Sequence, residues 1–405
     1  ILAGYKSSGN RKIDKKITDA VALSLDSYYN ERKGCCDMFL KRFEVENYKN
    51  FQHKITLDFS DIRDYKFNAK CIRDGLVKNA IIYGKNAVGK TNFGRAVFDI
   101  TYHLVDKNRD PQVQLCYSNA DSMDKRAKFC YTFISEGREI VYSYKKEEAD
   151  QVVYEALQID GELVFSFDFN NNKGDFSNLA KFGLETLNWE FRDNGISLLR
   201  YMANNLALDS KHPIMSLMRF VNGMLWFCSL GNGNNYIGFS TVIESMAEYI
   251  IKNGFVHDFE AFLNEYGVSE KIKVAIGPDG RKGLYFEHRN LIPLAMASSG
   301  TNALMAFYYW YKHAEKLSFL FIDEFDAFYH FELAEKIVRL LEDKFSMQVI
   351  LTSHNTNLLT NRIMRPDCYF ILTPEKLISF ANATSRELRE GHNLEKLFMS
   401  GEFDG

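Results

Sequence analysis

Apolar and polar residues alternate along several short stretches of this chain, beginning close to its N-terminal end. Phe39 to Asn47 and Ile55 to Phe59 alternate in this way, which predicts two half-buried strands. Four more alternating stretches lie between Phe129 and Phe169, and turn residues at Glu136-Gly137 and Asp160-Gly161 separate some of them. This pattern predicts an antiparallel meander of strands.

Short, continuously apolar runs predict a second kind of strand, one that is buried on both faces. Asn79 to Tyr83 is such a run, and a glycine-containing loop and a predicted helix from about Lys90 to Val105 follow it. In the C-terminal third, predicted helices and apolar strands follow one another: helix Thr301 to Glu315, strand Ser318 to Ile322, helix Phe331 to Lys344, strand Gln348 to Thr352, and the apolar runs Cys368 to Leu372 and Leu377 to Phe380. This order favours a parallel sheet.

The remaining segments complete the predicted organisation. The first 36 residues are polar and include one amphipathic helix, Asp14 to Tyr29. The segment after residue 170 is mostly helical in pattern, with a break at Gly231 to Asn235, and a hairpin follows that turns at Pro278-Asp279-Gly280. We therefore expect an N-terminal extension (1–36), an N-terminal half of the core with the meander (37–169), a helical insertion lobe (170–270) and a C-terminal half of the core (271–405). The fold class is α/β, with a mixed central sheet and an antiparallel β subdomain.

Composition narrows the functional class. With 46% hydrophobic and 25% charged residues, the chain has the average composition of a folded globular protein. Its 50 basic and 53 acidic residues exclude binding to nucleic acid through bulk charge, although a local basic groove stays open. No apolar run is long enough to span a membrane, and the N-terminal residues contain no secretory signal. Seven scattered cysteines without a CxxC pair favour reduced thiols, so we expect a cytoplasmic protein.

A phosphate-binding loop lies between the buried run Asn79 to Tyr83 and the helix that follows it. The residues from Gly84 to Thr91, GKNAVGKT, fit the pattern GxxxxGK[ST]. Glycines let the backbone N–H groups and the helix N-terminus surround a phosphate chain. We assign Gly84, Asn86, Gly89, Lys90 and Thr91 to nucleotide binding, with Lys90 on the β- and γ-phosphates and the Thr91 hydroxyl on Mg²⁺. The alternative, a fortuitous loop, is weakened by the strand before it and the helix after it.

Two carboxylates follow a second buried strand, in the run Phe319 to Glu324 (FLFIDE). Strands of a parallel sheet deliver such residues to the carboxyl edge, where nucleotide sites lie. We expect Asp323 to hold Mg²⁺, and Glu324 to orient and activate the attacking water as the catalytic base. Alone, a strand that ends in two acids is more often a solvated strand end. The P-loop about 230 residues earlier makes the functional interpretation strong.

Two further motifs accompany these. In Leu351 to Asn355 (LTSHN), His354 ends an apolar strand, and beside the other motifs we interpret it as a catalytic γ-phosphate contact rather than a structural histidine. In Ser298 to Thr301 (SSGT), small residues precede a helix, so Ser299, Gly300 and Thr301 can close on the γ-phosphate bound by a second molecule. An ordinary helix cap by Ser298 or Ser299 explains the same residues equally well.

This ordered set of motifs resembles ABC-class ATPases of the SMC, RecF and OLD group. The tail, Gly391 to Leu397 with Gly401 to Gly405, is similar to the tails of small bacterial anti-phage ATPases of abortive-infection, Septu- and PARIS-type systems. The resemblance implies ATP and Mg²⁺ as cofactors, and nucleotide contacts by Lys49 and Asn50. It also implies a homodimer or higher assembly, in which each ATP lies between the P-loop of one copy and the SSGT segment of the other.

Three features depart from the patterns of this group. The signature is SSGT rather than LSGGQ, which excludes the transporter branch. Phe331 stands where the OLD-like pattern usually has proline, and no glutamine-loop residue is convincing, since Gln112 and Gln114 lack a clear strand context. Water activation is therefore a weaker expectation than nucleotide binding.

Three functions fit these residues. The first is an ATP-hydrolysing sensor that regulates a separate toxic effector, such as a nuclease, in anti-phage defence. Only about fifty residues follow His354, so we expect the effector on another chain, docked on the aromatic-rich segment Asn170 to Tyr266 unless that segment packs its own core. The second is a DNA-repair or DNA-end-binding ATPase, for which locally basic residues are candidates: Arg63, Lys66, Lys70, Arg73 and Lys78. The third is a nucleotide switch without hydrolysis.

Overall fold

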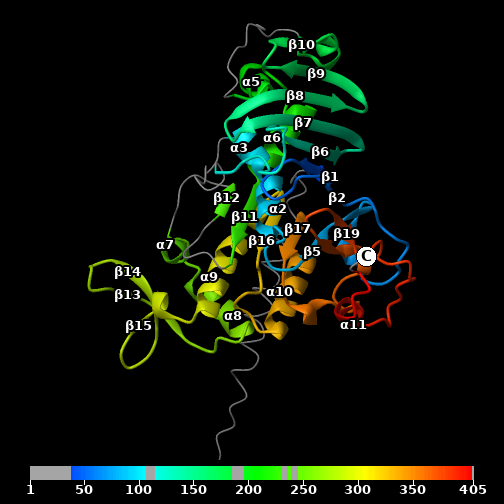
Figure 1. The fold of residues 1–405 in the computed structure, drawn as a ribbon. Helices are drawn as coiled ribbons and strands as arrows, with labels where there is room; N and C mark the ends of the chain where they lie inside the picture. The colour runs from blue at the N-terminus through cyan, green and yellow to red at the C-terminus, as the bar shows by residue number, and fades with distance from the viewer. Residues whose placement is uncertain (1–37, 106–114, 185–195, 230–235, 239–244, 404–405) are drawn as a thin grey trace, which may run out of the picture. The chain divides into compact units, whose positions relative to one another are not determined.

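The computed structural model describes residues 38–105, 115–184, 196–229, 236–238 and 245–403 (Figure 1). The segment Asp37–Gly405 forms one compact unit. Several sequence-based expectations lie outside the described residues: the extension 1–36 with its helix Asp14 to Tyr29, the break Gly231 to Asn235, and the candidates Gln112 and Gln114.

The central sheet has seven strands, and five of them run parallel. In spatial order its strands are β12 (Tyr236–Gly238), β11 (Met224–Cys228), β16 (Phe319–Asp323), β17 (Gln348–Thr352), β5 (Asn79–Tyr83), β18 (Tyr369–Leu372) and β19 (Leu377–Ser379). The edge strands β12 and β19 pair antiparallel with their neighbours. All residues of β5, β16, β17 and β18 are buried, as the continuous apolar runs predict.

The second sheet also has seven strands, all antiparallel. In spatial order they are β10 (Lys173–Asp175), β9 (Glu162–Asp168), β8 (Gln151–Ile159), β7 (Arg138–Glu148), β6 (Ala127–Ser135), β1 (Met38–Glu46) and β2 (Ile55–Asp58). The predicted meander is therefore confirmed as β6 to β9. Glu136 and Asp160 have positive φ angles of 50° and 53° and each is followed by a positive-φ glycine, which is the backbone of tight hairpin turns.

The helix that follows the P-loop lies between the two large sheets (Figure 1). This helix, α2 (Lys90–Val97), packs Phe93 against Phe43 of β1, and the Tyr131 hydroxyl of β6 donates to the Ala96 carbonyl over 3.0 Å. The predicted helix Lys90 to Val105 is interrupted at Phe98, after which α3 (Asp99–Val105) begins. Phe98 is fully buried against Phe319 and Phe321 of β16, so packing of this side chain accompanies the break.

The other helices and short strands surround these sheets. They are α5 (Leu198–Asn205), α6 (Pro213–Asn222), α7 (Met246–Lys252), α8 (Val256–Glu265), α9 (Ser299–Lys312), α10 (Phe331–Lys344) and α11 (Leu394–Met399), with a three-stranded sheet of β13 (Ile272–Ile276), β14 (Lys282–Phe286) and β15 (Ile292–Pro293), and the strand pair β3 (Ile72–Arg73) and β4 (Leu76–Val77). The 3-10 turns are η1 (Ala69–Cys71), η2 (Leu179–Phe182), η3 (Leu294–Met296), η4 (Ala314–Lys316), η5 (Thr356–Leu358) and η6 (Pro366–Cys368). Within the described residues, no helix has both the length and the apolar character needed to cross a membrane.

The range 170–270 differs from a purely helical insertion. It contains the four helices α5 to α8, but it also contributes β11 and β12 to the central sheet. β11 pairs in parallel with β16, and Cys228 lies opposite Asp323. This strand therefore belongs to the core, and it ends at the same edge of the sheet as the predicted acidic pair. The four-part division of the chain stays a prediction in its other boundaries.

Candidate nucleotide site

The P-loop connects β5 to α2 through a backbone that needs glycine at two positions. Gly89 has a φ angle of 103°, and a Cβ there would collide with the side-chain amide of Asn50. A Cβ at Gly84 would lie 2.8 Å from the Leu372 carbonyl oxygen, since the loop passes close to the end of β18. Ala87 also adopts a positive φ of 64°, and Asn86 lies exposed on the loop. The loop is thus tightly folded against its neighbours.

Asn50 supports this loop from outside. Its side-chain amide donates to the Val88 carbonyl over 2.9 Å and accepts from the Asn92 side chain over 2.8 Å. Lys49, at a φ of 48°, donates from Nζ to the Leu115 carbonyl over 2.9 Å. Asn50 therefore holds the P-loop, and direct contacts of Lys49 and Asn50 with a nucleotide stay predictions.

Lys90 begins helix α2 and is only 7% exposed. Its ammonium group donates to the Gly84 carbonyl over 3.0 Å, which folds the side chain back over the loop. Burial lowers the pKa of Lys90, while Asp323 and Glu324 act in the opposite direction. No side chain caps the start of α2, so its first backbone N–H groups are available to phosphate oxygens.

A chain of hydrogen bonds joins the ends of three sequence motifs. The Thr91 hydroxyl donates to Asp323 Oδ2 over 2.7 Å, and the Thr352 hydroxyl donates to Asp323 Oδ1 over 2.6 Å. Thr352 Oγ1 also accepts from the backbone N–H of Glu324 over 2.7 Å. Because Asp323 is fully buried, these hydroxyls satisfy a carboxylate that water does not reach. The structure thus brings together the P-loop, the acidic pair and the end of β17.

Glu324 has an uncommon backbone conformation for a residue with a side chain. Its φ angle is 49°, in the left-handed region. Hydrogen bonds hold the peptides on both sides of it: the Ser229 N–H donates to the Asp323 carbonyl over 3.1 Å, and the Phe325 N–H donates to the Thr352 carbonyl over 3.2 Å. Sequence reasoning missed both Thr352 and Ser229. Thr352 lies inside the TSHN motif and could have been noticed there, whereas Ser229 carries no motif of its own.

The electrostatic surroundings of the two predicted catalytic residues differ. Burial, with a further contribution from the Asp323 charge, raises the pKa of Glu324 above its usual value of 4.5, and Lys90 opposes this shift. His354 is largely exposed after β17; burial and the charge of Lys90 lower its pKa, while Asp326 and Asp323 oppose the shift. Asp326 accepts from the Ser353 hydroxyl over 2.6 Å. Burial and the charge of Lys90 thus favour the neutral form of His354, which lies within the electric field of the P-loop lysine.

The SSGT segment forms the start of α9. The Ser298 hydroxyl accepts from the Thr301 N–H over 3.2 Å, so Ser298 is a helix cap, as the alternative interpretation holds. A Cβ at Gly300 would lie 3.1 Å from the Phe328 carbonyl oxygen, which places the segment beside the loop that follows Glu324. Among the described residues, no hydrogen bond joins Ser299, Gly300 or Thr301 to the P-loop of the same chain.

The residues at the site fit Mg²⁺. Hydroxyl and carboxylate oxygens are preferred ligands of this ion, which commonly takes one or two carboxylates and completes its shell with phosphates and water. Thr91 and Asp323 supply these two donor types within hydrogen-bond distance of each other. They are the residues of this chain that would hold the ion.

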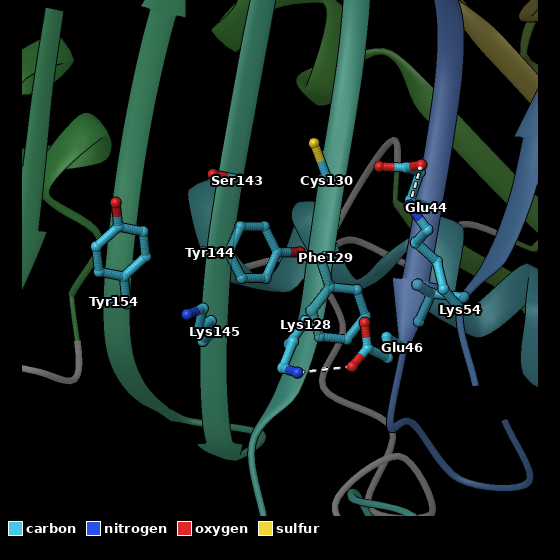
Figure 2. A pocket seen from close by; sticks show the side chains of 11 residues that line it. Glu44, Glu46, Lys54, Lys128, Phe129, Cys130, Ser143, Tyr144, Lys145 and Tyr154 are labelled. Atoms are coloured by element: carbon cyan, nitrogen blue, oxygen red, sulfur yellow. Dashed lines mark hydrogen bonds and ion pairs between the residues drawn. The ribbon is translucent and has the colours of Figure 1, made fainter. Parts of the chain in front are cut away.

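Several lysines of the antiparallel sheet and the loop beside it lie on a surface that also carries acidic residues. A pocket on β1, β6, β7 and β8 is lined by both signs of charge (Figure 2). Lys128 pairs with Glu46 over 2.6 Å, and Lys54 pairs with Glu44 over 3.1 Å. Neither this pocket nor its lysines form a continuous basic path.

The fold and the site together define the class of protein. A P-loop after one buried strand of a parallel sheet and an acidic pair after another are the features of an α/β P-loop ATPase fold. Residues 80–360 match the family described as "AAA domain, putative AbiEii toxin, Type IV TA system", and the chain belongs to this family. No match to a curated protein reaches significance.

Solved structures of SMC heads are similar to this chain in fold. The SMC head domain from Thermotoga maritima is 13% identical, with a TM-score of 0.43 over 84% of this chain and 98% of that chain. An SMC head bound to the C-terminal winged-helix domain of ScpA is 14% identical, with a TM-score of 0.43 over 84% and 97%. An SMC head with an extended coiled coil, bound to the C-terminal domain of ScpA derived from Pyrococcus furiosus, is 13% identical, with a TM-score of 0.44 over 84% and 96%.

Proposed function

We propose that this protein binds ATP with Mg²⁺ between two copies of the chain and hydrolyses it. The observation that carries this proposal is the hydrogen-bonded chain Thr91–Asp323–Thr352, which ends at the backbone of Glu324 and lies within the electric field of Lys90. Phosphoryl transfer needs little beyond positioning and charge stabilisation, and these residues supply both.

Each residue has a definite part in this mechanism. Lys90 and the free N–H groups at the start of α2 bind the phosphate oxygens. Mg²⁺, held by Thr91 and Asp323, would neutralise charge on the β- and γ-phosphates. Glu324 accepts a hydrogen bond from the attacking water and takes its proton, and its raised pKa makes it a better base near neutral pH. Neutral His354 donates a hydrogen bond to the γ-phosphate.

The second copy completes the site in this proposal. Ser299, Gly300 and Thr301 lie at the N-terminal end of a 14-residue helix, where backbone N–H groups favour anions. They make no hydrogen bond to the P-loop of their own chain within the described residues. We therefore place them on the γ-phosphate bound by the partner copy, so that ATP stabilises a homodimer or a higher assembly.

The biological role that we propose is regulation of a separate toxic effector, such as a nuclease, in bacterial anti-phage defence, inside the cytoplasm. The resemblance of the motifs and tail to anti-phage ATPases supports this role, and the family description, which names a putative toxin, is compatible with it. Cells that carry the complete operon should survive phage challenge, and Lys90→Ala should remove this protection. Protection that persists in the Lys90→Ala strain would contradict the role.

The DNA-binding alternative finds less support. Lys70 pairs with Asp343, Arg63 donates to Asn382, and Lys78 is buried. Two of these candidate residues therefore already have partners within the protein, and the third is buried. Salt-dependent DNA binding by the ATP-bound Glu324→Gln protein would nevertheless favour a repair function over effector regulation.

Two variants test ATP binding and hydrolysis directly. Lys90→Ala should weaken binding of a fluorescent ATP analogue by about 10- to 100-fold, because charged hydrogen bonds are lost, while Lys336→Ala, at an exposed position on α10, is the matched control. Glu324→Gln should keep binding, lower turnover by about 10²- to 10⁴-fold, and accumulate an ATP-dependent dimer in analytical ultracentrifugation. Glu332→Gln, an exposed acid nearby in sequence, is its control. Wild-type protein that binds ATP but gives no product in single-turnover assays would instead identify the nucleotide switch.

A further inference from the structure

Exposed apolar side chains are concentrated in the segment before the SSGT motif. Five of the eleven large exposed apolar side chains in the described residues lie within this short stretch: Val274, Ile276, Leu291, Ile292 and Met296. Two of them are strongly exposed, Ile276 at 71% and Met296 at 76%. Clustered apolar exposure marks interaction surfaces in soluble proteins. We call this region, from β13 to η3, the β13–β15 surface.

A cavity lies directly beside these side chains. Its volume is about 430 Å³, and it lies where β14, β15 and η3 meet α7 and α9. Apolar residues from these elements contribute to its lining: Leu284, Pro293, Leu294, Met246 and Met305. The exposed residues adjoin the residues that line the cavity, since Val274 lies opposite Leu284 in the sheet and Ile292 directly precedes Pro293. The cavity is large enough to accept a bulky side chain from a binding partner.

The rim of the cavity carries positive charge. Arg281 and Lys282 both line it and are exposed, and neither forms an ion pair with another described residue. Asp279 is the acidic residue of the lining, and it accepts from the Arg281 backbone N–H over 3.1 Å. An apolar cavity with a cationic rim is complementary to an apolar side chain flanked by carboxylates.

We propose that the β13–β15 surface docks an extended segment of a partner protein in which acidic residues flank one or two large apolar side chains. An apolar side chain of the segment enters the cavity, and its flanking carboxylates meet Arg281 and Lys282. The chemistry of this surface would thus select the effector, and the inference rests on the proposed function in calling that partner an effector and in connecting the site to ATP.

The docking surface is connected to the proposed ATP-dependent assembly. Leu294 lines the cavity and lies four residues before Ser298, the cap of α9. Met305 lines it from α9 itself, the helix that begins with the SSGT motif. A segment bound in the cavity would therefore contact residues that flank the SSGT motif on both sides in the sequence. Binding of the segment and binding of ATP should consequently influence each other reciprocally.

Fluorescence anisotropy with synthetic peptides tests the docking without nucleotide. The probe is a labelled hexapeptide Glu-Asp-Phe-Leu-Asp-Glu, compared with Lys-Lys-Phe-Leu-Lys-Lys and with Glu-Asp-Ser-Ser-Asp-Glu. We expect the first peptide to bind at least tenfold more tightly than either of the others. Equal affinities for the acidic and basic peptides, or no binding below about 1 mM for any of them, would overturn the proposal.

Three protein variants locate the binding. Arg281→Glu combined with Lys282→Glu should weaken peptide binding at least tenfold, and Ala295→Trp, at another residue of the cavity lining, should do the same without altering charge. The control is Met123→Ala with Lys125→Glu, which changes an exposed methionine and an exposed lysine on the loop before β6, outside the lining of the cavity. Unchanged binding in the first two variants, or equal loss in the control, would overturn the assignment of the site. Thermal unfolding curves establish that all variants are folded.

A second copy of this chain is the competing occupant. If wild-type protein without nucleotide forms a dimer that Ile276→Asp dissociates, the surface is a self-interface and the proposal is wrong. We expect Ile276→Asp to leave the sedimentation coefficient unchanged and to weaken peptide binding. Because these measurements use no nucleotide, their outcome is independent of whether the protein hydrolyses ATP. A change of at least twofold in turnover on adding the acidic peptide then measures the connection between the two sites.

Discussion

The hydroxyl of Thr352 donates a 2.6 Å hydrogen bond to Asp323 Oδ1, and this bond joins the ends of two adjacent parallel strands. The same oxygen accepts from the N–H of Glu324. A single hydroxyl thus orients the proposed metal ligand and fixes the backbone of the proposed base in its left-handed conformation. The positions of both acids depend on a residue that touches neither nucleotide nor water in the proposed mechanism.

Replacing Thr352 by valine should show this dependence. The variant keeps the shape of the side chain but leaves a buried carboxylate oxygen and an N–H without that partner, so we expect unfolding free energy to fall by about 1–3 kcal/mol. We also expect kcat to fall with little change in KM, since Glu324 is no longer held. Thr352→Ser, which keeps the hydroxyl, should retain most of the wild-type stability and most of the wild-type kcat. A valine variant with reduced stability and unchanged kcat would limit Thr352 to a structural role.

Titration of Glu324 should determine how turnover depends on pH on the acidic side. A base works only when deprotonated, so activity is lost as pH falls through its pKa in the folded protein. Since burial and Asp323 raise this pKa, the acidic limb of kcat/KM should lie above the usual value of 4.5 for glutamate. His354, with a lowered pKa, protonates only below its usual 6.5 and is the competing source of the limb. In His354→Gln, the acidic limb of kcat/KM should stay at the same pH. If the acidic limb disappeared in this variant, it would be due to the titration of His354.

Asn50 provides a test of how the P-loop is held. Asn50→Ala removes the hydrogen bonds to Val88 and Asn92, so the loop becomes less ordered and ATP affinity should fall by about 2- to 10-fold. Gly89→Ala should be more severe, because the φ angle of 103° is strained for alanine and its Cβ meets Asn50. Equilibrium titration with a fluorescent ATP analogue measures both. If Gly89→Ala bound ATP normally, the loop would have to adopt a different backbone from the one described here.

The buried ion pair Asp99–Lys146 should contribute strongly to stability. The two groups are 2.7 Å apart with side chains at most 2% exposed, and the Tyr117 and Tyr144 hydroxyls also donate to Asp99. Lys146→Met leaves an uncompensated buried carboxylate and should cost about 3–5 kcal/mol in chemical denaturation. Lys145→Met, at a half-buried neighbouring position that carries no such pair, should cost far less. A double variant with Asp99→Asn should lose less than the sum of the two single changes.

Much of the central sheet could be predicted because its strands are short apolar runs between clear helix and turn signals. Asn79–Tyr83, Phe331–Lys344 and Gln348–Thr352 have the predicted bounds. β11 could not be predicted in the same way. Its apolar residues follow those of α6 almost without interruption, and a strand buried on both faces lacks the alternation that separates it from a buried helix.

The residues of the candidate site that belong to sequence motifs could be predicted. The residues that reach the site through strand pairing and register could not. Thr91 and Asp323 could be paired in advance, since both motifs lie at the carboxyl edge of one sheet. The contacts of Ser229 and Thr352 depend instead on which strands flank β16 and on their alignment. The local sequence around Ser229 does not indicate that β11 pairs with β16, the strand that ends at Asp323.

The sheet order also bears on how the chain folds during synthesis. Thr91 and Asp323 are 232 residues apart, and β5 pairs with strands that are all made later, β17 and β18. At about 5–20 residues per second, roughly 10–50 seconds separate the emergence of the P-loop from that of its acidic partner. During that interval both edges of β5 lack their neighbours, while the meander β6 to β9 already has every strand it needs. The antiparallel sheet can therefore fold first. It can cover one side of the P-loop helix α2 until the ribosome has synthesised the rest of the site.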